Sequence, residues 1–193
     1  PFHSTANLIT GLRDANFVEL DEGATWSIKA PGKYYVTRGD SSLIAFSLGS
    51  HPVTEVGLQM VGSHTDSPCL KLKPNAAFKA NGYWQLGVEV YGGALLNPWF
   101  DRDLSIAGRV TLNRASGELF SRLIDFDQAI AIIPSLAIHL DREANNKRSI
   151  NKQTYLPPII CTSTGEFDLE QEIINRLTAN EPDLGGVEVA AFE

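Results

Sequence analysis

Val61-Gly62-Ser63-His64-Thr65-Asp66-Ser67-Pro68 is the stretch around which the chain is organised. It follows a mostly apolar run, residues 56–61, and ends in proline, so the pattern predicts a buried strand with polar side chains at its end. Side chains alternate along a strand, which places His64 and Asp66 on one face and Thr65 on the other. The sequence therefore predicts that the histidine and the aspartate act together.

His64 and Asp66 have the chemistry of a metal ligand and its supporting group. A neutral imidazole is the commonest protein ligand for zinc-type metals. A carboxylate on the same face can accept the other ring N–H and so set the tautomer of the histidine. Taken alone, His-x-Asp also fits an ordinary histidine at a strand end, and the residues of this stretch leave both interpretations open.

The composition restricts the class of protein. The chain has 193 residues, 43% hydrophobic and 20% charged, as is typical of soluble globular proteins. A formal net charge of −7 without a basic cluster argues against a nucleic-acid or anionic-membrane partner. The longest nearly apolar run, residues 129–140, is too short to span a bilayer. Cys69 and Cys161 form no disulfide framework and fit a reducing cytoplasm, although a single bridge between them stays open.

The order of periodic segments predicts an α/β fold with two parts. The first part begins with a helix capped by Ser4, and a hairpin follows that shares a sheet with the strand ending at His64. From Leu70 onward, short strands follow one another without a helix of useful length until a late helix and a final strand. The segments are a hairpin (33–37 and 42–48), strands at 70–72, 84–90, 104–112, 119–126, 129–133, 136–140 and 156–160, a helix (168–179) and a strand (187–192).

A second candidate metal site is Asp101-Arg102-Asp103, whose two aspartates share a face if the segment is extended. An arginine lies between them and no third carboxylate is near in sequence, so a structural ion-pair cluster is the better interpretation. The chain has no Gly-x-Ser-x-Gly elbow, no Walker loop and no Gly-x-Gly-x-x-Gly fingerprint. Cys69 has no assigned base, so a cysteine hydrolase is equally unsupported.

Three longer strings resemble the aspartyl aminopeptidase family in their order and spacing: GSHTDSPCLKLKPN (62–75), QLGVEVYGGALLNPWFDRDLSIAGRVTL (85–112) and IIPSLAIHLDRE (132–143). PFHSTANL (1–8) resembles the first helix of that family, and the resemblance weakens after about Pro158. Members are metallopeptidases with two metal ions. The resemblance implies that residues 1–69 are the N-terminal part of a metallopeptidase domain with a mixed sheet. It implies that residues 70–193 are an inserted β-rich dimerisation domain that returns toward the catalytic domain at its end.

The same resemblance implies a role for each of three residues. His64 would ligate one of the two metals, and Asp66 would be the catalytic-site residue that orients it. His139, in the Ile-His-Leu string, would reach the active site of a neighbouring subunit and hold the substrate there. From pattern alone, His139 is an exposed strand histidine.

By this likeness the complete protein is a zinc-dependent aminopeptidase of the cytoplasm that removes N-terminal residues, preferably acidic ones, from peptides. Its subunits would form dimers that assemble into a dodecamer. Zinc is the default metal for such ligands, and Co²⁺ or Mn²⁺ at one position is also compatible. The family's bridging aspartate, glutamate pair, further aspartate and late histidine match nothing here, so we expect an incomplete N-terminal portion that is inactive alone. Two alternatives stay open, a non-catalytic oligomerisation module and a related metalloaminopeptidase with neutral specificity.

Overall fold

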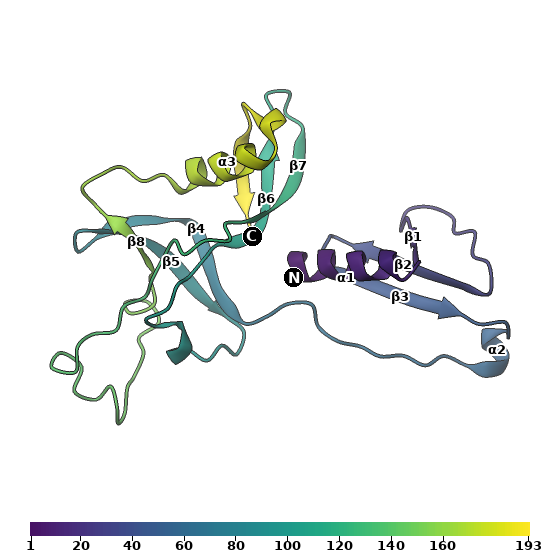
Figure 1. Ribbon diagram of the computed structural model, residues 1–193, viewed down its shortest axis with the longest axis horizontal. Coiled ribbons are helices and arrows are strands. Elements are labelled where there is room, and N and C mark those ends of the chain that lie inside the picture. Colours follow the sequence, from purple (N-terminus) through teal and green to yellow (C-terminus); the bar gives the residue numbers. More distant parts are fainter. The chain divides into compact units, whose positions relative to one another are not determined.

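The computed structural model describes residues 1–193, which divide into two compact units, Pro1–Ser67 and Pro68–Glu193. Both units contain β-sheet and at least one helix (Figure 1), so the fold is of the mixed α/β class that the sequence predicts. The division falls close to the predicted change between residues 69 and 70. The assignment of the two units to a peptidase domain and a dimerisation domain stays a prediction.

The first unit packs a helix against a mixed three-stranded sheet (Figure 1). Its elements are α1 (Phe2–Asp14), β1 (Val18–Leu20), β2 (Gly32–Arg38) and β3 (Ser42–Leu48). β1 runs parallel to β2, and β3 runs antiparallel to it. The predicted hairpin is confirmed, with Gly39 and Asp40 in the left-handed conformation at its turn (φ 57° and 56°), which glycine and aspartate tolerate. The predicted cap is wrong, because α1 begins at Phe2 and Ser4 lies inside its first turn.

A polar network joins α1 to this sheet. The fully buried Tyr35 donates its hydroxyl to Glu19 Oε2 (2.9 Å) and accepts a hydrogen bond from Arg13 Nε (3.0 Å). Arg13 Nη2 also contacts Glu19 Oε2 at 2.9 Å. The hydrogen bonds from Arg13 and, next, from Tyr35 hold the pKa of Glu19 below its ordinary value. The end of α1 is thus tied to β1 and β2 through groups that satisfy one another.

The predicted strand before His64 does not form. A short helix α2 (Val53–Val56) is followed by residues 57–68, which have no regular secondary structure (Figure 1). Met60 and Val61 are 86% and 100% exposed. The physical reason is that a strand needs a neighbour for its backbone hydrogen bonds, and no strand of this chain pairs with residues 57–68. The apolar pattern is present, but its side chains are exposed.

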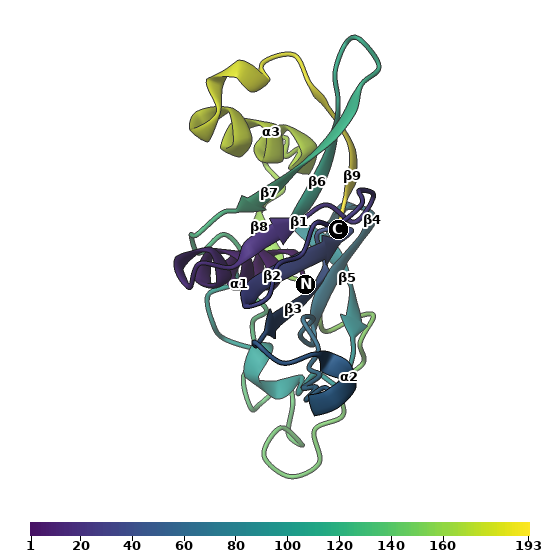
Figure 2. The same ribbon diagram turned by 90° about the vertical axis from the view of Figure 1, so that its right-hand side faces the viewer.

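The second unit contains two antiparallel three-stranded sheets. One has the order β4-β5-β8 and the other has the order β7-β6-β9. The strands are β4 (Cys69–Ala80), β5 (Tyr83–Tyr91), β6 (Ala107–Asn113), β7 (Leu119–Asp125), β8 (Ile159–Thr162) and β9 (Glu188–Phe192), with short 3₁₀ turns at Asn97–Trp99 and Pro182–Leu184. Helix α3 (Leu169–Asn180) lies against the sheet of β7, β6 and β9 (Figure 2).

One of the two buried clusters joins the two sheets and α3. It includes Leu86 of β5, Val110 and Leu112 of β6, and Ile173 and Leu177 of α3. The predicted helix over residues 168–179 is confirmed. It forms because its apolar residues recur at helical spacing and pack into this core. Both cysteines are unpaired.

One region of the second unit departs from the predicted strands. Residues 129–133 make only isolated bridges, with Phe100, Leu104 and Ile159 as partners. The predicted strand 136–140 is wrong, because residues 138–140 form a turn. Pro134 between the two segments has no N–H to donate to a ladder. The predicted edge strand at 156–160 begins later, as β8, after its two prolines.

Candidate functional site

His64 and Asp66 lie together, as predicted, although not on a strand. His64 Nδ1 is 2.8 Å from the backbone carbonyl oxygen of Asp66 and 3.4 Å from its Oδ1. Both neighbours are acceptors, so the ring carries its proton on Nδ1 and donates it to them. A neutral ring with this tautomer has its lone pair on Nε2, in a side chain that is 78% exposed. The arrangement leaves Nε2 as the ring nitrogen that can bind a ligand.

Asp66 supports His64 in a different way from the predicted one. The sequence predicts that its carboxylate accepts the ring N–H, whereas the backbone carbonyl is the nearer acceptor. The carboxylate adds negative charge beside the same nitrogen, which favours a proton there. Two oxygens of one residue therefore act on a single N–H.

Thr65 is a site residue that the sequence did not reveal. Its hydroxyl donates to the backbone carbonyl of Ser41 at 2.7 Å, in the turn between β2 and β3. Residues 57–68 have no strand neighbours, so this bond is a long-range attachment of the segment to the hairpin. The only sequence signal was the alternation that put Thr65 opposite to His64 and Asp66.

The residues present fit part of a metal centre. A catalytic zinc ion takes three protein ligands and an open position. No group of three or more His, Cys, Asp or Glu side chains in this chain is arranged to hold a metal ion. His64 thus supplies one donor nitrogen with its tautomer set, and the chain does not supply a complete ligand set.

At the rival site Asp101-Arg102-Asp103, the side chains of Asp101 and Arg102 each bind a backbone group. Asp101 Oδ1 accepts a hydrogen bond from the backbone N–H of Ser135 at 2.7 Å. That hydrogen bonding, helped by the positive charge of Arg148, holds the pKa of Asp101 below its ordinary value. Arg102 donates instead to the carbonyl of Pro98 at 3.4 Å.

His139 lies in the second unit, whereas His64 lies in the first. It belongs to an exposed turn in which Leu140 N donates to the carbonyl of Ala137 at 2.8 Å. The structure therefore does not group His139 with the pair at His64 and Asp66 in one unit. The predicted role of His139 at a neighbouring subunit's site stays a prediction.

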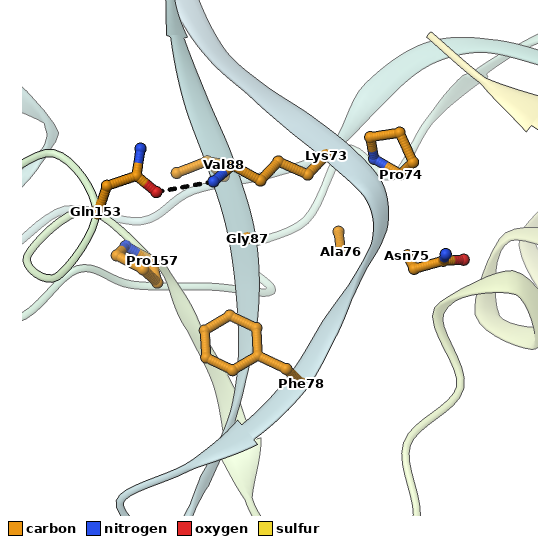
Figure 3. A pocket seen from close by; sticks show the side chains of 9 residues that line it. All are labelled: Lys73, Pro74, Asn75, Ala76, Phe78, Gly87, Val88, Gln153 and Pro157. Carbon is orange, nitrogen blue, oxygen red and sulfur yellow. Dashed lines mark hydrogen bonds between the residues drawn. The ribbon is translucent and has the colours of Figure 1, made fainter.

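A pocket of about 270 Å³ lies in the second unit between β4, β5 and residues 153–157 (Figure 3). Lys73 Nζ donates to Gln153 Oε1 at 2.8 Å at one side of it. β4 is irregular here, because its register with β5 shifts between Leu72 and Ala77. The lining holds no His, Cys, Asp or Glu and none of the predicted site residues, so the pocket is no candidate metal centre.

Relatives with closely similar sequences are described as M18 family aminopeptidases. The chain is 58% identical over 166 residues to a "Probable M18 family aminopeptidase 2" of Pseudomonas fluorescens (strain SBW25), covering 86% of this chain and 38% of the relative. It is 61% identical over 161 residues to the protein of that description from Pseudomonas aeruginosa (strain UCBPP-PA14), covering 83% and 37%. The chain thus spans less than two fifths of the length of these curated relatives.

Solved structures show the same likeness. In the cryo-EM structure of the Ape4 and Nbr1 complex, the matching chain is 34% identical with a TM-score of 0.84, covering 100% of this chain and 40% of that one. The mApe1 dodecamer of S. cerevisiae matches with 31% identity and a TM-score of 0.69, covering 99% and 42%. The model of the family "Aminopeptidase I zinc metalloprotease (M18)" matches residues 1–182. The chain belongs to the M18 family of aminopeptidase I zinc metalloproteases.

Proposed function

We propose that the protein to which this chain belongs is a zinc-dependent aminopeptidase, in which His64 is a metal ligand. The observation that supports this most directly is the ring of His64, whose Nδ1 donates to Asp66 and whose other nitrogen, Nε2, is left to ligate a metal from a side chain that is 78% exposed. A histidine held in this way is ready to ligate, because ligation requires the neutral form with the lone pair on the free nitrogen.

Each residue of His64-Thr65-Asp66 has a separate task in this proposal. His64 provides the nitrogen, Asp66 keeps the ring proton on the opposite nitrogen, and Thr65 holds the segment on the β2–β3 turn. Zinc, when bound, polarises a peptide carbonyl and lowers the pKa of its bound water. We place the other ligands and the general base in the part of the relatives' length that this chain does not span, with two metals in the full site and Co²⁺ or Mn²⁺ as alternatives to zinc.

The proposal extends to substrate, assembly and location. Acidic N-terminal residues are the preferred substrates, an inference that rests on the resemblance of the quoted strings to aspartyl aminopeptidases. Assembly into a dodecamer is inferred from the S. cerevisiae relative, which is described as one. A cytoplasmic location agrees with two unpaired cysteines. None of the helices has the length and apolar character needed to cross a bilayer.

The test compares the complete protein with its His64→Ala variant. Zinc per subunit is measured together with hydrolysis of peptides that begin with Glu or with Leu. We expect His64→Ala to lower the rate on the order of 10²-fold or more and to reduce bound zinc. His51→Ala is the matched control, because His51 is an exposed loop histidine of the same unit.

Each alternative has its own outcome. A His64→Ala variant with full zinc and full rate contradicts the role of His64. Faster hydrolysis of the Leu peptide contradicts the acidic preference and supports the neutral alternative. A complete wild-type protein that assembles, binds no zinc and hydrolyses neither peptide is the oligomerisation module without catalysis.

A further inference from the structure

His139 lies in a long loop whose two ends are buried. Residues 134–155 contain no helix or strand, and they form most of the extended green loop in Figure 1. Ile133 before the loop and Leu156 after it are 1% and 0% exposed. Residues 136–140 between them are exposed. A loop without its own secondary structure takes its position from a few contacts, so those contacts decide where the imidazole lies.

Asp101 holds the start of this loop. Its backbone N–H donates to the carbonyl of Ile133 at 2.9 Å, and its Oδ1 accepts from the N–H of Ser135 at 2.7 Å. The two bonds lie on either side of Pro134, which has no N–H of its own. Asp101 has a φ of 55°, in the left-handed region that aspartate adopts more readily than most residues. Aspartate suits position 101 because its side chain accepts this hydrogen bond and its backbone tolerates a positive φ.

Arg148 holds the other side of the loop. Its guanidinium lies over the ring of the buried Phe100, 4.1 Å from the ring centroid, and its Nε is 3.6 Å from Asp141 Oδ2. The side chains of Arg148 and Asp141 are only 19% and 28% exposed, so solvent screens this pair less than a surface pair. Asp141 N also donates to the carbonyl of Ala137 at 3.2 Å, across the turn that carries His139.

We infer that Asp101 and Arg148 are positioning residues that set the place of His139. Both residues attach the loop to the same short segment, because Arg148 stacks on Phe100, the direct neighbour of Asp101. The contacts with Ser135 and Asp141 lie on either side of His139 in the chain. The inference rests on the proposed aminopeptidase function and on the role predicted for His139 in it, which is to hold the substrate at a neighbouring subunit's site. A displacement of such a group by about 1 Å can lower a rate on the order of 10²-fold.

The test uses the complete, assembled enzyme with zinc bound. We expect Asp101→Ala to lower kcat about tenfold while the oligomer persists. Asp101→Asn keeps an oxygen acceptor and tolerates the same backbone, so most of the rate should return. Asp103→Ala is the control, since Asp103 is an exposed aspartate two residues along and should leave kcat unchanged.

A double-mutant cycle with His139→Ala separates positioning from a general structural role. If Asp101 acts through His139, adding Asp101→Ala to His139→Ala lowers kcat no further. Arg148→Ala should show the same non-additivity, and it carries the test if Asp101→Ala fails to assemble. Additive losses in both cycles, or an unchanged kcat in both single variants, overturn the inference. If His139→Ala alone leaves kcat unchanged, the proposed role of His139 fails first, and positioning fails with it.

Discussion

At the residue scale, the three consecutive residues His64, Thr65 and Asp66 each help to present Nε2 of the histidine ring. His64 is exposed and its orientation comes from Asp66, two residues along. Thr65 points to a different partner, the carbonyl of Ser41, which is 24 residues away in the chain. Thr65 therefore attaches the segment to the hairpin, whereas Asp66 of the same segment orients the His64 ring.

Replacement of Asp66 by alanine should weaken zinc binding less than replacement of His64. The backbone carbonyl at 2.8 Å remains as an acceptor in Asp66→Ala, so the tautomer is kept and only the carboxylate is lost. We expect roughly a tenfold loss of zinc affinity, at the low end for residues that support a ligand. Competition with a chelator on the complete protein measures it. A loss as large as that of His64→Ala would show that the carboxylate itself is needed for ligation.

The network of Arg13, Glu19 and Tyr35 predicts a pH dependence. The pKa of Glu19 is lowered in the folded state, so its contribution to stability is full above the unfolded-state pKa of about 4.3 and is lost as pH falls through the folded value. The Tm difference between wild type and Glu19→Gln should therefore be largest near neutral pH and shrink below about pH 4. Glu55→Gln, at an exposed glutamate of the same unit, is the control. A difference that stays constant down to pH 3 would exclude the network as its source.

At the element scale, α3 shows how a local signal and a core combine. Asp168 caps the helix, because its Oδ1 accepts from the N–H groups of Glu170 at 2.9 Å and Gln171 at 3.1 Å. Ile173 and Leu177, four residues apart, are buried on one stripe. Proline at residue 182 follows the end of the helix, where the hydrogen-bond ladder cannot continue. The residues of α3 and the proline after it thus explain where the helix starts, which face it buries and where it ends.

Loss of the cap should loosen the first turn of α3. Asp168→Ala removes two hydrogen bonds to otherwise unpaired N–H groups, which destabilises a helix by about 1 kcal/mol. We expect the amides of Glu170 and Gln171 to exchange roughly fivefold faster with solvent deuterium in the complete protein. Asp168→Ser retains a capping oxygen and should restore protection. Equal exchange in wild type and Asp168→Ala would mean that packing alone holds this turn.

At the scale of the whole molecule, two apolar segments are exposed. Met60 and Val61 precede His64, and Leu136 and Leu140 flank His139, all of them more than half exposed. Single exposed apolar residues are ordinary, but these occur beside the two histidines proposed to act in the site. Each of the two histidines therefore has exposed apolar side chains close to it in the sequence.

Mixed oligomers test whether His139 acts in trans. Subunits with His64→Ala lack a metal ligand, and subunits with His139→Ala lack the imidazole offered to a neighbour. If the proposed arrangement holds, a His139→Ala subunit keeps an intact metal site that His139 of an adjacent His64→Ala subunit can serve. Co-expression at equal amounts should restore about a quarter of the wild-type sites by random pairing in a symmetric assembly. Mixed oligomers with no more activity than the two separate variants would place His139 in its own subunit's site.

Elements whose causes are local could be predicted from the residues alone. The hairpin around Gly39-Asp40 and the helix α3 follow from periodicity, turn residues and capping, which act within a few residues. The pairing of His64 with Asp66 was also predictable, because two residues of spacing keep them close even where no strand forms. The β-rich character of the second part followed from the density of alternating segments.

The partners of these segments became known from the three-dimensional fold. Residues 56–61 and 136–140 have the apolar pattern of strands, yet neither has a neighbouring strand in the chain. The contacts of Thr65 with Ser41 and of Asp101 with Ser135 join residues that no spacing rule connects. The physical reason is that periodicity shows which side chains favour burial, whereas a strand or an anchored loop also requires a specific neighbour to accept its hydrogen bonds.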